Sequence, residues 1–197
     1  VLLTLCGLGW AQQRELKPGW NLFSKDQDIQ LGKEAKAQIE KEVVVVKDAA
    51  LSEYVRSIGQ KLASQPQAGG YPYSFDVVHD DSINAFALPG GPTFVHTGLI
   101  AAAENEAQLA GVMAHEIAHV ALRHGTNQAS KAGLMQLPVM LGSAMLGKRG
   151  GLLGALGELG IGLGANSLLL KYSRNAERDA DLLGTRMMAQ AGYNPVE

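Results

Sequence analysis

One short run, Ala114-His115-Glu116-Ile117-Ala118-His119, constrains this chain more than any other feature. Histidines four residues apart project from one face of an α-helix, one turn apart, so they can share a metal ion. Zinc held by two histidines and one more protein ligand keeps its fourth position for water, and lowers the pKa of that water towards ~7. Glu116 then lies beside the metal and is the candidate general base for that water. The run predicts a helix that carries a hydrolytic zinc site, against the alternative of an amphipathic helix with incidental histidines.

A third ligand must come from further along the chain. His124 follows His119 by five residues, which should point it well away around a continuing helix. Acidic residues that follow are Glu158, Glu177, Asp179, Asp181 and Glu197. Glu177 and Asp181 share one helix face, a pairing that suits a ligand carboxylate and a partner that orients a zinc-bound histidine. A solvated helix face is the alternative reading of that pair.

The remaining periodicities predict a mainly helical α+β fold. Helices are expected over 24–43, capped by Ser24, over 48–62, from 105 to about 125, and over 175–191, stopped by Gly192. Alternating apolar residues predict a strand over 71–80, and two further strands fit 83–88 and 93–96, separated by a turn at 89–92. We expect these strands to form a small antiparallel sheet beside the helix that carries His115.

Length and charge limit the class of protein. The 197 residues suit one domain, which we place at 12–197. The net charge is only -2 and the sequence has no basic stripe of the kind that nucleic-acid binding needs, so no nucleic-acid partner is expected. Residues 1–11 are expected to be the remnant of a signal peptide, so the protein is predicted to be exported. A buried N-terminal helix is the alternative. Removing that leader would also remove Cys6, the only cysteine, and we expect the natural chain to continue past Glu197.

The segment 132–170 is rich in leucine, methionine and glycine and has few charges. It joins the two helices that carry the candidate ligands. We therefore expect a mobile flap over the zinc cleft that touches unfolded clients or a membrane surface. A buried core hairpin, a membrane hairpin and a disordered linker are the alternatives.

Three separated motifs together resemble a known family. They are His115-Glu116-x-x-His119, the stretch Asn84 to Gly91, and Tyr172-Ser173-Arg174 followed by Glu177-x-x-x-Asp181. The chain resembles zinc metallopeptidases of the HtpX and CAAX-prenyl-protease kind, and is most similar to their soluble, exported BepA-like bacterial members. The likeness covers roughly residues 50 to 195.

The resemblance implies a zincin-like domain with one Zn²⁺ per chain, bound by His115, His119 and Glu177. It also implies Glu116 as catalytic base and Asp181 as an accessory carboxylate, for which we favour orientation of a ligand over proton donation. Tyr172 and Arg174 are both candidates to stabilise the oxyanion. The oligomeric state is left open.

The expected activity is hydrolysis of internal peptide bonds in unfolded or misassembled proteins of the cell envelope, in the periplasm, with peripheral membrane or outer-membrane assembly contacts. Extended substrates can add to an exposed edge of the sheet, although an ordinary packed hairpin explains the strands equally well. The alternative function is a chaperone or assembly factor that acts mainly by binding clients. A structural zinc domain is disfavoured, because such sites usually close all four positions with cysteine or histidine.

Overall fold

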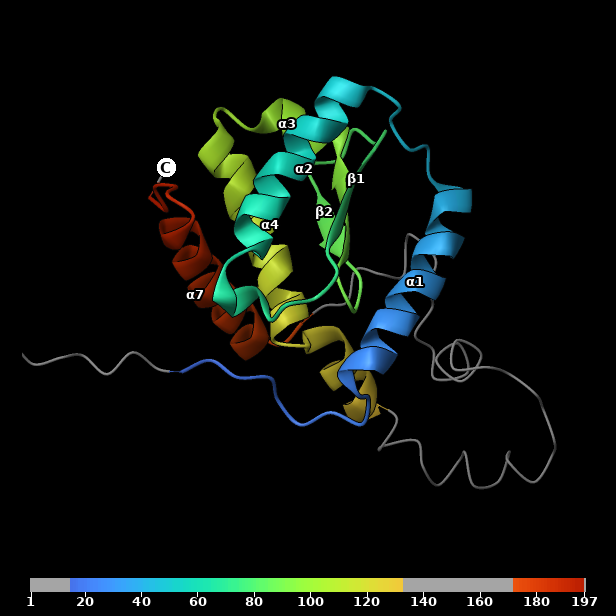
Figure 1. Cartoon of the computed structure of the whole chain (residues 1–197), viewed down its shortest axis with the longest axis vertical. Coiled ribbons are helices and arrows are strands. Elements are labelled where there is room, and N and C mark those ends of the chain that lie inside the picture. The colour runs from blue at the N-terminus through green and yellow to red at the C-terminus, as the bar shows by residue number, and fades with distance from the viewer. Residues whose placement is uncertain (1–14, 133–171, 197) are drawn as a thin grey trace, which may run out of the picture.

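A computed structural model describes residues 15–132 and 172–196 (Figure 1). The elements are α1 (Lys25–Glu42), α2 (Ala49–Ala63), the 3-10 turn η1 (Pro66–Ala68), β1 (Ser74–Val78), β2 (Ala85–Ala87), β3 (Pro92–His96), α3 (Thr97–Ala102), α4 (Glu106–Ala121) and α7 (Arg174–Gln190). Residues 124–132 are also helical. The mainly helical α+β class is therefore confirmed, and four of these helices match the predicted ones closely.

Side-chain caps explain why those four helices begin where they do. The Ser24 hydroxyl accepts from the backbone N–H of Gln27, whose side chain in turn accepts from the Ser24 N–H. Such a capping box satisfies N–H groups that have no partner within the helix. Asp48, Asn105 and Ser173 are the N-cap residues of α2, α4 and α7. Each side chain accepts a hydrogen bond from the backbone N–H three residues later. At the far end of α7, Gly192 has a φ of 81°, as expected for a glycine stop.

The sheet is mixed, so the predicted antiparallel sheet is wrong in one of its two pairings. Strand order in the described chain is β1-β3-β2, with β2 antiparallel and β1 parallel to β3. β2 and β3 form the expected hairpin through the turn at Gly90 and Gly91. β3 lies between its two predecessors and runs parallel to β1. Period-two alternation predicts which side chains are buried and carries no information on which strand is the neighbour.

The sheet is covered on both faces. Its two faces belong to two separate clusters of buried side chains. One cluster joins Val78, Phe86, Leu88 and Phe94 to Ala35 and Ile39 of α1. The other joins Phe75, Val77, Ala85 and Val95 to side chains of α2, α4 and α7. The result is a layered arrangement in which α4 lies between the sheet and α7 (Figure 1).

The outer edge of β2 is the edge that faces the predicted catalytic helix. At the opposite edge of the sheet, the backbone of residues 44–46 pairs with β1. The hydrogen bonds run from Val46 N–H to Val77 O and from His79 N–H to Val44 O. In the described part of the chain, no further strand pairs with β2. β2 contacts α4 instead, and this places an unextended strand edge next to the motif.

Two glycines allow α1 to approach the β2–β3 turn closely. A Cβ on Gly32 would lie 1.9 Å from the carbonyl oxygen of Pro89, and one on Gly90 would lie 2.4 Å from Cα of Ile29. No side-chain rearrangement can relieve these contacts, because the opposing atoms are backbone. α1 therefore supports the turn that sets the end of β2.

We expect Gly32→Ala to lower the free energy of unfolding by about 1–3 kcal/mol, the usual cost of overpacking a tight interface. Gly111→Ala is the matched control, since its new Cβ would lie 3.5 Å from Sδ of Met188, an ordinary contact. In a helix interior that control should be neutral or stabilising by up to about 1 kcal/mol. Urea denaturation of both variants measures the difference. Equal stabilities of the two variants would contradict the close approach of α1 to the turn.

Several predicted features lie outside the described residues. These are the signal-peptide remnant at 1–11, Cys6, Glu158, the ends of the chain and nearly all of the flap at 132–170. Among residues 15–132 and 172–196, no helix is both long and apolar enough to cross a membrane.

Candidate active site

The three predicted metal ligands converge at one place between α4 and α7. His115 Nε2 and His119 Nε2 are 2.9 Å apart, as expected for histidines one turn apart on α4. Glu177, in the first turn of α7, places its carboxylate oxygens 3.4 Å from His115 Nε2 and 3.9 Å from His119 Nε2. These are the residues in the described chain whose ligand atoms form a group able to hold a metal ion.

Glu177 reaches the α4 histidines because α7 packs closely along α4. Glu177, Ala180, Gly184 and Met187 recur at helical spacing on the face of α7 that meets α4. A Cβ on Gly184 would lie 3.1 Å from the backbone nitrogen of His115 and 3.2 Å from the carbonyl carbon of Ala114. The glycine thus removes the side chain that would hold the two helices apart.

The ligand spacing fits zinc. Metal–nitrogen bonds of ~2.0–2.1 Å in a tetrahedral site place ligand atoms about 3.3 Å apart. The nitrogen–nitrogen separation of 2.9 Å and the separations of 3.4 and 3.9 Å to the two Glu177 oxygens lie around that value. Two imidazoles and one carboxylate are also the donor set of catalytic zinc sites that leave a position for water.

Asp181 lies one turn beyond Glu177 and contacts the other side of the first histidine. Its Oδ1 is 2.8 Å from His115 Nδ1, and the carboxylate is otherwise largely exposed to solvent. A carboxylate on Nδ1 favours the tautomer that leaves Nε2 free to bind a metal. The geometry therefore suits orientation of His115.

His124 lies against His119, contrary to the expectation that it points away. α4 ends at Ala121, and Arg123 has a φ of 57°, a left-handed conformation that costs a non-glycine residue about 1–2 kcal/mol. The chain therefore turns back, and His124 Nδ1 is 2.9 Å from His119 Nδ1. The expectation failed because it assumed a continuing helix. The Arg123-His124-Gly125 stop was the available signal.

Both of these histidines are held in the neutral form that can bind metal or accept a hydrogen bond. Burial, reinforced by His115 and His124, lowers the pKa of His119 to about 3. Burial likewise lowers the pKa of His124 to about 4, although the carboxylate of Asp179 opposes the shift. At neutral pH, therefore, no proton competes with a metal ion for His119 Nε2.

Glu116 faces the edge of β2. Its Oε2 accepts a hydrogen bond of 3.2 Å from the backbone N–H of Ala87. Burial raises the pKa of Glu116 to about 8, while the Ala87 bond acts in the opposite direction. A carboxylate whose proton affinity is raised in this way is suited to receive a proton during catalysis. Sequence reasoning missed Ala87, because a backbone group has no residue-type signature.

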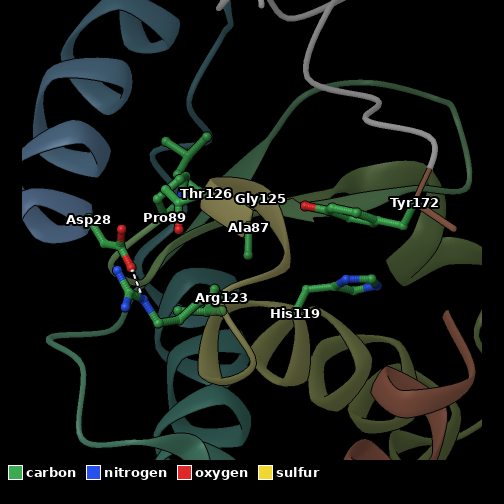
Figure 2. Close-up of a pocket in the computed structure, with 10 residues that line it drawn as sticks. Asp28, Ala87, Pro89, His119, Arg123, Gly125, Thr126 and Tyr172 are labelled. Carbon is green, nitrogen blue, oxygen red and sulfur yellow. Dashed lines mark hydrogen bonds and ion pairs between the residues drawn. The ribbon is translucent and has the colours of Figure 1, made fainter. Parts of the chain in front are cut away.

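Tyr172 covers His119. Their rings stack with centroids 4.1 Å apart and an angle of 20° between planes. Burial raises the pKa of Tyr172, and the nearby carboxylates of Glu116 and Glu177 add to the shift, so the hydroxyl keeps its proton. Figure 2 shows the ring over His119 in a pocket that Ala87 and Arg123 also line. Of the two oxyanion candidates, Tyr172 is the one that lines this pocket.

Comparison with known families gives a match over most of the chain. The profile of peptidase family M48 matches residues 49–197. That range contains all of the motif-bearing elements, from α2 to α7, and excludes α1.

Individual proteins match over a similar range. The beta-barrel assembly-enhancing protease of Escherichia coli (strain K12) is 30% identical over 176 residues, which cover 88% of this chain and 36% of the relative. The mitochondrial metalloendopeptidase OMA1 of Schizosaccharomyces pombe is 32% identical over 142 residues, covering 72% of this chain and 40% of the relative. This chain thus spans well under half the length of either relative.

Proposed function

The chain belongs to peptidase family M48, and from that premise we propose that it is a zinc-dependent endopeptidase with a zincin-like catalytic domain. Its substrates are internal peptide bonds of unfolded or misassembled cell-envelope proteins. The observation that carries the proposal is the convergence of His115, His119 and Glu177 beside the buried Glu116. The match to relatives named as proteases supports the same reaction class.

The chemistry divides between the metal and the chain. When bound by His115, His119 and Glu177, zinc supplies a Lewis acid that polarises the scissile carbonyl and acidifies a water molecule. Glu116 takes the proton from the attacking water and passes it to the departing amine. Asp181 orients His115 through Nδ1, and we assign stabilisation of the oxyanion to the Tyr172 hydroxyl, which keeps its proton. One proton is thereby moved from the nucleophile to the leaving group.

Substrate binding is proposed to occur on the outer edge of β2. Asn84 and Leu88 pair with β3 through His96 N–H to Asn84 O and Leu88 N–H to Pro92 O. Because pairing alternates along an antiparallel strand, the backbone groups of Ala85 and Ala87 face the opposite edge, where the Ala87 N–H is bonded to Glu116 and the other groups pair with no strand of the described chain. An extended peptide that pairs there lies beside Glu116, held by its backbone without a required side chain. Unfolded chains can present such a backbone.

We further propose that the protein acts in the periplasm on clients of outer-membrane assembly. The support is similarity to a protease named for enhancing β-barrel assembly. Contacts with the membrane surface or with the assembly machinery belong to the same proposal.

The test is cleavage of an unfolded protein by the zinc-loaded chain, with a folded protein of similar size as control. We expect fragments that lack both original termini, as an endopeptidase produces, only from the unfolded substrate. Cleavage should stop when a chelator removes zinc and return when zinc is restored, because the Lewis acid is then lost and regained. Mass spectrometry of the fragments measures this.

Each other outcome has a meaning. Cleavage that persists without metal would contradict zinc dependence. Release of terminal residues alone would contradict endopeptidase action. Binding that prevents aggregation of the substrate, without any fragments, would favour the chaperone alternative.

A further inference from the structure

His124 contacts the nitrogen of His119 that a metal ion would not use. His119 Nε2 faces His115 Nε2 and Glu177, whereas His119 Nδ1 faces His124 Nδ1 at 2.9 Å. The two imidazole rings have centroids 4.9 Å apart and are inclined by 73°. A neutral imidazole that binds metal through Nε2 carries its hydrogen on Nδ1. The Nδ1–H of His119 is then the donor, and Nδ1 of His124 must be the acceptor.

Arg123, the residue before His124, forms an ion pair with Asp28 of α1. On an unbroken helix, a residue five positions after His119 would lie about 140° around the axis from it. The left-handed Arg123 replaces that geometry, and its guanidinium is bound at both sides, with Nε donating to Asp28 Oδ2 at 2.6 Å and Nη2 donating to Phe23 O at 2.5 Å. Asp28 is only 2% exposed, and Figure 2 shows its pair with Arg123 in the same pocket as His119.

The helical residues that follow this turn also form hydrogen bonds with the chain before α1. Asn21 donates from its amide to the Thr126 hydroxyl, and the Leu22 N–H donates to Ser130. Residues 124–132 are therefore held from the N-terminal side of the molecule, by residues that precede the matched range of the family profile. This arrangement gives the turn a fixed position relative to α4.

We propose that His124 is a positioning residue for the metal ligand His119, accepting a hydrogen bond from its Nδ1–H, and that the Asp28–Arg123 pair holds the turn that places it there. The inference rests on the proposed zinc site. Each α4 histidine then has its own partner on Nδ1: Asp181 for His115 and His124 for His119. The partner of the more buried histidine is an imidazole, whereas the partner of His115 is a carboxylate.

The experiment compares two substitutions of nearly equal size. His124→Asn keeps an acceptor oxygen close to the position of Nδ1, and His124→Leu removes the acceptor. Zinc affinity is measured for both variants and the parent by competition with a chromophoric chelator. We expect His124→Leu to bind zinc on the order of 10- to 100-fold more weakly, the usual effect of removing a partner of a ligand histidine, and His124→Asn to recover most of the loss. The metal-free proteins should melt within about 2 °C of one another, a shift of ~1 kcal/mol or less.

A second measurement needs no substitution. Nitrogen-15 NMR of histidines in the zinc-loaded parent should show a proton on Nδ1 of His119 and on Nε2 of His124. A proton on Nδ1 of His124 would overturn the proposal, and so would equal zinc affinities of the Leu variant and the parent. A parent that binds no zinc would overturn the proposed function as well, so the two failures are distinguishable.

Discussion

Replacing Glu116 by Gln is expected to lower the rate of peptide hydrolysis by about 10²- to 10⁴-fold while the zinc content stays at one per chain. The amide cannot take a proton from the attacking water at neutral pH. It does retain an oxygen that can accept the Ala87 N–H, so the edge of β2 should keep its position. The three ligands His115, His119 and Glu177 are unchanged. A peptidase assay combined with metal analysis measures both quantities.

Glu53→Gln is the matched control for this change. Glu53 is an exposed residue of α2 that forms an ion pair with Arg56, and it lies outside the site. Its loss should leave both hydrolysis and zinc binding as in the parent. Full activity in Glu116→Gln, or loss of zinc from it, would contradict the role of Glu116 as a base that does not bind the metal.

Glu177→Ala is expected to weaken zinc binding severely, and Asp181→Asn to weaken zinc binding or activity by on the order of 10- to 100-fold. The first change removes a ligand whose oxygens lie 3.4 and 3.9 Å from the two imidazole nitrogens. The second keeps an oxygen beside His115 Nδ1 and removes only its charge. Titration with a chelator gives the affinities, and the ranking of the two is the prediction.

Glu158→Ala provides the comparison for Glu177. Glu158 is an acidic residue in the glycine-rich segment, outside the described residues, and was an alternative ligand on the sequence alone. We expect its loss to leave zinc affinity unchanged. If Glu158→Ala lost zinc and Glu177→Ala bound it like the parent, the assignment of the third ligand would be wrong.

The helices were predicted well because caps, stops and apolar spacing each depend on a few neighbouring residues. Ser24 and Asn105 cap the helices that they were expected to begin, and Gly192 ends α7 with a positive φ. The sheet was less predictable. Alternation identified β1, and the turn between 83–88 and 93–96 identified β2 and β3, but local patterns did not give the order β1-β3-β2, in which β3 lies between strands that come earlier in the chain.

The candidate site shows the same division. The spacing of His115 and His119 placed two imidazoles on one face of a helix, and the spacing of Glu177 and Asp181 placed two carboxylates on another. These are consequences of helical geometry, so the sequence by itself determined them. It also placed Glu116 between the two histidines on the same helix, which made it the candidate base.

Only the tertiary structure decided how the two helices meet and what surrounds them. Gly184 lets α7 approach α4 until Glu177 reaches both histidines, and β2 brings the Ala87 N–H to Glu116. His124 is the sharpest case, because a single left-handed residue, stabilised by Asp28 from nearly a hundred residues earlier, reverses the direction in which it points. Contacts of that kind depend on packing between distant segments, which no local pattern of residues encodes.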